Sequence, residues 1–195
     1  MNMSKNEFDM LLSLSVNEET LEIGYIAGSQ KVFFVKTGQG GSIYRYLELA
    51  IKMNEDYGCT VFVSPTNIDK RYVYESEMKL VCEQMQSEQY EIYYMGISKG
   101  GLIGCWYADG EPRVKKIVAV NAPLMINFHN RTLPAIQSLS SKITMYYGSR
   151  DPSYTYIPFA SRFVKVNVIE GADHMLKGHT EMYESIAREL LDERF

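Results

Sequence analysis

One serine stands among four glycines in the stretch YYMGISKGGLIG, residues 93–104. An apolar run that is typical of a buried strand leads directly into G-x-S-x-G, with Ser98 at its centre. Where this pattern joins a strand to a helix, the sharp turn strains the serine backbone, and the glycines leave room for neighbouring backbone. The hydroxyl then stands exposed at the N-terminus of a helix. Ser98 is therefore a candidate nucleophile.

Two other interpretations of this stretch are open. An ordinary glycine-rich turn is the simpler one, because Gly and Ser are common residues. A phosphate-binding loop is the other, but the stretch contains neither G-x-G-x-x-G nor G-x-x-x-x-G-K-[ST]. The predicted strand before Ser98 and the predicted helix after it favour the nucleophile.

A serine nucleophile needs a general base, and the chain has three histidines. His174 lies in IEGADHMLKGH, between the last predicted strand and the last predicted helix, and is the candidate base. His129, in INFHNR, is interpreted as a surface or capping residue. The same interpretation applies to His179, which is predicted at the start of the final helix.

The base in turn needs an acid that orients it. Asp151, in YYGSRDPSY, follows the penultimate predicted strand and is the candidate. Asp173 precedes His174 directly, and adjacent side chains of one loop rarely face each other, so we expect Asp173 to brace the turn or face solvent. Asp109, in YADGEP, is predicted to close the helix that follows Ser98.

A tetrahedral intermediate also needs donors for its oxyanion, and the loss of one donor costs roughly 3 kcal/mol. The backbone N–H of Lys99, the residue after the candidate nucleophile, is the first predicted donor. The second is expected in KTGQGGS, a loop after an earlier predicted strand, where glycines let backbone N–H groups point inward. A plain glycine turn is the alternative interpretation of that loop.

Alternating strands and amphipathic helices would position these loops. Strands are predicted within residues 31–41, 59–65, 91–96, 115–123, 143–152 and 164–174, and helices within residues 42–58, 75–90, 98–108, 133–141 and 179–195. Ser42 can cap the first helix and Gly58 can end it. Residues 11–16 and 21–28 can pair as an antiparallel edge. This order predicts an α/β fold: a doubly wound, mainly parallel sheet of about six to eight strands with helices on both faces.

Composition narrows the class of protein. The chain is 46% hydrophobic and 23% charged, and its 195 residues fit a single domain spanning 1–195. A net charge of -4 provides no basic field for nucleic acid. No segment approaches the ~20 apolar residues of a membrane helix. Cys59, Cys82 and Cys105 are widely spaced, which favours buried free thiols over disulfides or a zinc site. We therefore expect a soluble, cytoplasmic protein that needs no metal or cofactor.

Taken together, these motifs resemble the α/β-hydrolase superfamily, from about residue 31 to the C-terminus. The resemblance rests on TGQGGS (similar to the family's H-G-x-G-G-S), GISKGG, GSRDPS and GADH, each after a predicted strand. It implies Ser98 as nucleophile, His174 as base and Asp151 as acid. It also implies the backbone N–H groups of Gln39 and Lys99 as the oxyanion hole.

Two features depart from the family's pattern. Thr37 stands where many members have histidine, which removes one familiar contact. The stretch between the strands at 115–123 and 143–152 leaves space for one helix and no separate cap domain. The string GISKGG is also similar to the elbow of the acyl-CoA thioesterase and bile-acid-CoA acyltransferase group.

The sequence thus predicts a serine hydrolase that cleaves a small-molecule carboxylic ester or thioester through an acyl-enzyme. Acyl transfer to an acceptor other than water is one alternative, and a non-catalytic binding protein with the same fold is another. Apolar residues near the site loops predict a partly apolar acyl site, unless they only pack the loops: Met125, Phe128, Tyr154, Tyr156 and Met175. The sequence does not indicate the oligomeric state.

Overall fold

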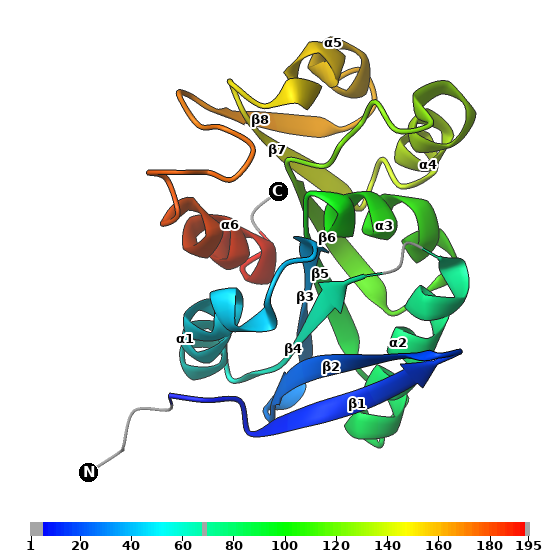
Figure 1. The fold of residues 1–195 in the computed structure, drawn as a ribbon, viewed down its shortest axis with the longest axis vertical. Helices are drawn as coiled ribbons and strands as arrows, with labels where there is room; N and C mark the ends of the chain where they lie inside the picture. Colours follow the sequence, from blue (N-terminus) through cyan, green and yellow to red (C-terminus); the bar gives the residue numbers. More distant parts are fainter. Residues whose placement is uncertain (1–5, 68–69, 194–195) are drawn as a thin grey trace.

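An eight-stranded sheet forms the centre of the protein, whose computed structural model describes residues 6–67 and 70–193 (Figure 1). The strands are β1 (Met10–Val16), β2 (Glu19–Ile26), β3 (Ser29–Gln39), β4 (Cys59–Thr66), β5 (Glu91–Ile97), β6 (Val114–Val120), β7 (Ile143–Gly148) and β8 (Lys165–Ile169). Their order in the sheet is β1-β2-β4-β3-β5-β6-β7-β8. The β1–β2 and β2–β4 pairs are antiparallel and the other pairs are parallel. The predicted mainly parallel sheet and its antiparallel edge are confirmed.

Helices cover both faces of the sheet (Figure 1). They are α1 (Leu47–Tyr57), α2 (Arg71–Met85), α3 (Lys99–Tyr107), α4 (Leu133–Ser138), α5 (Ile157–Ala160) and α6 (Met182–Leu191). Residues of α1 and α6 share one buried cluster with the sheet, and residues of α2, α3 and α4 share the other. The sheet is therefore doubly wound, as predicted.

The ends of two helices test the expected caps. Ser42 Oγ accepts a hydrogen bond from the backbone N–H of Tyr44 and so caps the short 3-10 helix (residues 43–46) that leads into α1. Gly58, with φ 61°, ends α1 as predicted. The prediction that His179 starts the final helix is wrong, because α6 begins at Met182. Gly178, with φ +77°, turns the chain just before His179, and a turn at residues 180–181 then leads into the helix.

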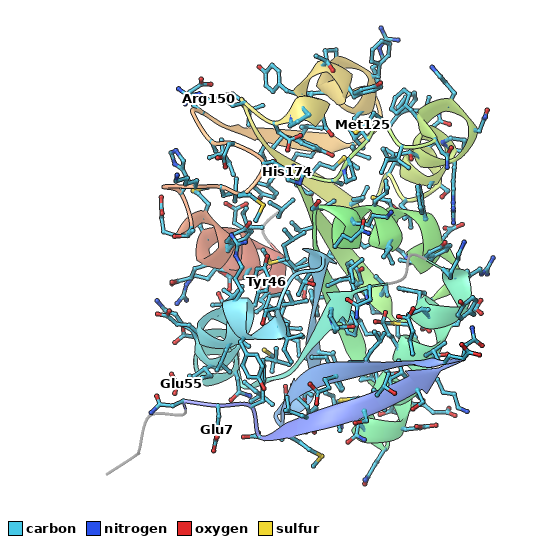
Figure 2. The ribbon with its side chains drawn as sticks, viewed as in Figure 1. Glu7, Tyr46, Glu55, Met125, Arg150 and His174 are labelled. Atoms are coloured by element: carbon cyan, nitrogen blue, oxygen red, sulfur yellow. The ribbon has the colours of Figure 1, made fainter. Side chains whose placement is uncertain are left out.

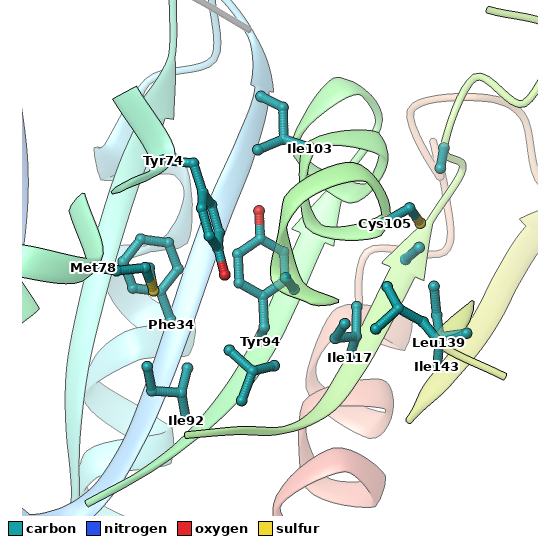
Figure 3. Close-up of a cluster of buried hydrophobic side chains, with 14 of the residues drawn as sticks. Phe34, Tyr74, Met78, Ile92, Tyr94, Ile103, Cys105, Ile117, Leu139 and Ile143 are labelled. Carbon is teal, nitrogen blue, oxygen red and sulfur yellow. The ribbon is translucent and has the colours of Figure 1, made fainter. Parts of the chain in front are cut away.

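Side chains of β3 and β5 alternate between the two buried clusters. Phe34 and Tyr94 point toward α2 and α3, and their stacked rings have centroids 5.5 Å apart (Figure 3). Phe33 and Tyr93 point to the opposite face, where α1 and α6 pack. Both strands are buried on both faces, which explains their continuous apolar runs in the sequence.

The connection between β6 and β7 is too short to form a separate cap domain. In the described chain this connection contains a single π-helical turn at residues 128–132 and the six-residue α4. The prediction of a fold without a separate cap is confirmed. The carboxyl ends of the central strands are thus left for short loops, where open α/β sheets place their sites.

The three cysteines are free thiols. Cys59 and Cys105 are buried, as predicted, but Cys82 is partly exposed because it lies at the margin of the packed face of α2. Over the described ranges, no helix has the length and apolar character needed to cross a membrane.

Candidate active site

The turn between β5 and α3 holds Ser98 in a strained conformation. Ser98 has φ 50° and ψ -120°, a combination that residues with a side chain rarely adopt. Its backbone N–H donates to the carbonyl of Val120 on β6, at 2.7 Å. Because β3 and β5 are neighbours although β4 lies between them in the chain, the turn sits where the strand order reverses.

Close contacts with backbone atoms and with one buried ring explain the glycines around Ser98. A Cβ on Gly96 would lie 2.5 Å from the carbonyl of Gly100. A Cβ on Gly100 would lie 2.3 Å from the backbone oxygen of Lys36, and one on Gly104 would lie 2.4 Å from the ring of Tyr94. These distances are too short for any side chain, so the elbow helix can pack against β3 and β5 only if these residues are glycines.

We expect Gly100→Ala to lower the free energy of unfolding by about 1–3 kcal/mol, because the methyl group would meet the Lys36 carbonyl and force the backbone apart. Urea unfolding would measure the loss. Gly110→Ala is the matched control, since the nearest atom to its new methyl is a terminal nitrogen of Arg71 at 3.9 Å. Equal stability of the two variants would contradict the packing argument.

Hydrogen bonds connect Ser98 to a histidine and an acid from two other loops. Ser98 Oγ lies 2.9 Å from Nε2 of His174, which follows β8. Nδ1 of the same ring lies 2.5 Å from Oδ2 of Asp151, which follows β7. Figure 2 shows His174 in the upper half of the view, on the loop between β8 and α6. The structure therefore brings together the three side chains that the sequence singled out.

Burial and the neighbouring carboxylate act in opposite directions on the pKa of His174. The Asp151 side chain is fully buried, and its second oxygen, Oδ1, accepts from the backbone N–H of Ser153 at 2.6 Å. The His174 ring is 35% exposed. The hydrogen bond to Asp151 raises the pKa of His174 above its ordinary 6.5, and partial burial opposes this.

The other candidate acids and bases take different places. Oδ1 of Asp173 accepts the backbone N–H groups of Met175 and Lys177, at 3.0 and 2.9 Å, so Asp173 braces the loop. Asp109 lies in the 3-10 turn that closes α3. His129 is exposed in the π-helical turn after β6.

The loop after β3 lies against the elbow. A Cβ on Gly38 would be 3.3 Å from Cβ of Ser98. Gln39 is the last residue of β3 and Lys99 is the first residue of α3, so the two residues implied as oxyanion donors come from the elements that meet at Ser98. Their role as donors stays a prediction.

Thr37, which departs from the family's histidine, stabilises this loop. Its side chain is buried, and Oγ1 lies within hydrogen-bond distance of the carbonyls of Gly38 and Gly41, at 3.0 and 3.2 Å. Oγ1 also accepts from the backbone N–H of Thr66 at 3.2 Å, and the hydroxyl of Thr66 donates to the Thr37 carbonyl at 2.7 Å. The threonine thus ties the glycine loop to β4.

The predicted apolar residues divide into exposed and packed side chains. Met125, Tyr154 and Met175 are 36%, 42% and 49% exposed, on the loops after β6, β7 and β8 (Met125 is labelled in Figure 2). Phe128 is buried, and its ring packs on that of Tyr156 at 5.0 Å between centroids. Phe128 therefore packs the loop, whereas the side chains of the other three are exposed.

Three residues beside this site were not anticipated. Tyr94 donates its hydroxyl to the carbonyl of Gly100 at 2.8 Å, and Ser153 holds the Asp151 carboxylate. Asn121 contacts the backbone of the His174 loop. The pattern D-P-S is an available signal for Ser153, since an aspartate before proline is a favoured helix cap. Asn121 falls inside the predicted strand 115–123, whereas in the structure β6 ends one residue earlier, at Val120.

No group of three His, Cys, Asp or Glu residues in the described part of the chain is arranged to hold a metal ion.

Comparison with known proteins places this geometry on a known fold. No protein-family model and no curated protein matches the chain. Est1E from Butyrivibrio proteoclasticus matches with a TM-score of 0.74 at 13% identity, over 94% of this chain and 98% of that one. A dienelactone hydrolase from Anabaena variabilis matches with a TM-score of 0.72 at 15% identity, over 94% of each chain. XC6422 from Xanthomonas campestris, described as an α/β serine hydrolase without a lid, matches with a TM-score of 0.69 at 12% identity, over 100% of this chain and 98% of that one. The chain thus has the α/β-hydrolase fold that the motif resemblance predicted, in the form without a lid that the short stretch between β6 and β7 predicted.

Proposed function

We propose that the protein is a serine hydrolase that cleaves a carboxylic ester or thioester through an acyl-enzyme intermediate. The observation that carries the proposal is the relay from Ser98 Oγ through the His174 ring to Asp151, with steps of 2.9 and 2.5 Å. These distances suit proton transfer between a nucleophile and its base. Matches to structures named as serine hydrolases and as a dienelactone hydrolase support the reaction class.

The first half-reaction acylates Ser98. Its Oγ attacks the carbonyl carbon while Nε2 of His174 takes the hydroxyl proton, and the carbonyl oxygen becomes an oxyanion. The backbone N–H groups of Gln39 and Lys99 are the proposed donors to that oxyanion. Asp151 holds the imidazole and stabilises the imidazolium. When the intermediate collapses, His174 gives the proton to the departing alcohol or thiol.

The second half-reaction releases the acid. Nε2 of His174 takes a proton from water, and the resulting hydroxide attacks the acyl carbon. Collapse of the second intermediate returns the proton from His174 to Ser98 Oγ and frees the carboxylic acid. The partly exposed His174 ring lets water reach the acyl-enzyme, which favours hydrolysis over transfer to another acceptor.

The substrate is proposed to be a small molecule with an apolar acyl group. Met125, Tyr154 and Met175 offer exposed apolar surface on the loops beside Ser98 and His174. The whole chain is proposed to act as one catalytic domain, since the relay joins loops after β5, β7 and β8. Three free thiols favour the reducing cytoplasm as its place of action.

Turnover of p-nitrophenyl esters and of acyl thioesters with graded chain length tests the proposal. We expect steady release of one carboxylic acid per leaving group, preceded at low temperature by a burst of leaving group that matches the enzyme concentration. Longer acyl chains should raise kcat/KM, because they bury more apolar surface. Absence of turnover for every compound, by folded wild-type protein, would contradict the proposal.

The pH dependence of kcat/KM should follow the protonation of the His174 ring. The neutral imidazole is the base, so kcat/KM should rise with pH through the pKa of His174 in the free enzyme. Since the hydrogen bond to Asp151 raises that pKa, the midpoint of the acidic limb should lie above 6.5. Asp151→Asn should lower kcat by about 10⁴-fold and move the limb to lower pH, because the amide favours the wrong ring tautomer and removes the stabilising charge.

Rate profiles of wild type, Asp151→Asn and the control Asp109→Asn across the neutral pH range would measure both effects. Asp109 is a matched control because it lies in the turn that closes α3 and outside the relay. An acidic limb that stays in place when Asp151 loses its charge would argue against the assigned acid.

A further inference from the structure

Asn121 is a buried polar residue at the carboxyl end of β6. Its side chain is fully buried, and its φ of 48° is a conformation that asparagine tolerates better than most residues. Its backbone N–H donates to the carbonyl of Tyr146 on β7, at 2.8 Å. This hydrogen bond holds the main chain of Asn121 against β7, beneath the loops that follow β7 and β8.

The Asn121 amide joins these two loops through three hydrogen bonds. Nδ2 donates to the carbonyl of His174 at 2.8 Å and to that of Asp173 at 3.2 Å. Oδ1 accepts from the backbone N–H of Gly148, at 2.9 Å. Gly148 ends β7 and lies three residues before Asp151. One side chain thus holds both the backbone of the base and the start of the loop that carries the acid.

The His174 loop has particular need of such support. It runs from the end of β8 at Ile169 to the start of α6 at Met182 without regular structure, and the His174 ring is 35% exposed. Few side chains can therefore confine the ring from outside. A misplacement of about 1 Å, caused away from the reacting atoms, lowers a rate by about 100-fold. The backbone N–H of Arg150 donates to the carbonyl of Ala172, at 2.9 Å, and the Asn121 bonds to the carbonyls of 173 and 174 extend this restraint to His174 itself.

We propose that Asn121 is a positioning residue for the Ser98–His174–Asp151 relay, whose amide fixes the main chain at His174 relative to the loop that carries Asp151. This inference rests on the proposed function and names a further residue of the same site. Asn121 acts through the backbone of the base and takes no part in the bond changes.

Two variants distinguish the effect of the Asn121 side-chain amide from that of its backbone conformation. Asn121→Gly removes all three side-chain bonds and keeps a residue that accepts φ 48°. Asn121→Asp keeps the shape and the acceptor for Gly148 but replaces the two donated bonds by repulsion between oxygens. We expect each variant to lower kcat for an activated ester by about 10- to 100-fold, with KM changed less than about twofold. Asn17→Gly is the matched control, because Asn17 has φ 56° and is exposed between β1 and β2.

The titration of the His174 ring adds a readout that needs no substrate. The groups that face His174 are the Asp151 carboxylate from the loop after β7, Ser98 from the elbow and Asp173 from its own loop. A ring held less firmly against Asp151 should have a lower pKa, because that hydrogen bond is the main cause of the upward shift. We expect NMR of the imidazole protons to show this decrease in Asn121→Gly, with His129 and His179 as internal references.

Each result decides the proposal. A folded Asn121→Gly with wild-type kcat and wild-type titration of His174 would overturn it. If neither variant folds while Asn17→Gly does, Asn121 supports the fold rather than the relay, and the proposal is also overturned. If wild type turns over no ester, the proposed function fails, and the His174 titration still decides whether Asn121 positions the ring.

Discussion

Replacing Ser98 by alanine should abolish ester turnover, with a decrease in kcat of about 10⁶-fold, while the protein stays folded. The substitution removes Oγ, the atom that lies 2.9 Å from His174 Nε2 and that would carry the acyl group. The elbow backbone and the proposed oxyanion donors stay in place, so a small residual rate above the uncatalysed reaction should persist.

Stability should change little in the same variant. The φ of 50° at Ser98 costs on the order of 1–3 kcal/mol in either residue, and alanine adds no volume. Steady-state kinetics on a short activated ester and thermal melts would measure both quantities. Ser141→Ala is the control, since Ser141 is exposed in the turn before β7. Full turnover by Ser98→Ala would refute the assignment of the nucleophile.

Removing Ser98 and His174 together should cost no more than removing either residue alone. Each single alanine variant should lose about 10⁶-fold in kcat, and the double variant should lose about the same, because the two side chains act as a unit in one proton transfer. Independent contributions would multiply and give a far larger loss in the double variant. The geometry favours the first outcome, since one hydrogen bond joins the two side chains.

Kinetics of the two single variants and the double variant on the same ester would complete this cycle. Melting temperatures within a few degrees of wild type would exclude loss of fold as the cause. A double variant clearly slower than both single variants would show that the two residues do not share one step.

The main fold and the relay could be predicted because both have local signatures in the sequence. The continuous apolar runs of β3 and β5 reflect strands that are buried on both faces. Ser98 stands in a pattern whose glycines are required by close backbone contact. Asp151 and His174 each follow a strand, and parallel strands bring such loops to one edge.

Other features depend on contacts between distant segments and leave no local signal. Lys36 lies in the predicted strand 31–41, and its side chain is buried in an ion pair with Glu77 of α2. Its Nζ also donates to Ser64 Oγ at 3.1 Å and to the Pro65 carbonyl at 2.7 Å. Only the pairing of β3 with β4 and the packing of α2 bring these groups together. A lone lysine in an apolar run therefore could not reveal its partner.

The same limit applies to Asn121 and Phe128. Asn121 contacts residues about fifty positions later in the chain, through backbone carbonyls that every residue has. Phe128 was predicted among the substrate-contacting residues, but its ring packs on Tyr156 and is buried. Position in a loop does not tell whether an aromatic side chain faces solvent or its own loop.

Covalent labelling with a fluorophosphonate, followed by intact mass and peptide mapping, tests the central claim most directly. The claim is that Ser98 is a nucleophile activated by His174. It predicts one adduct per chain, located on Ser98, absent in Ser98→Ala and formed much more slowly in His174→Ala. An adduct on another residue, no adduct on folded wild type, or an equal rate of labelling in His174→Ala would contradict it.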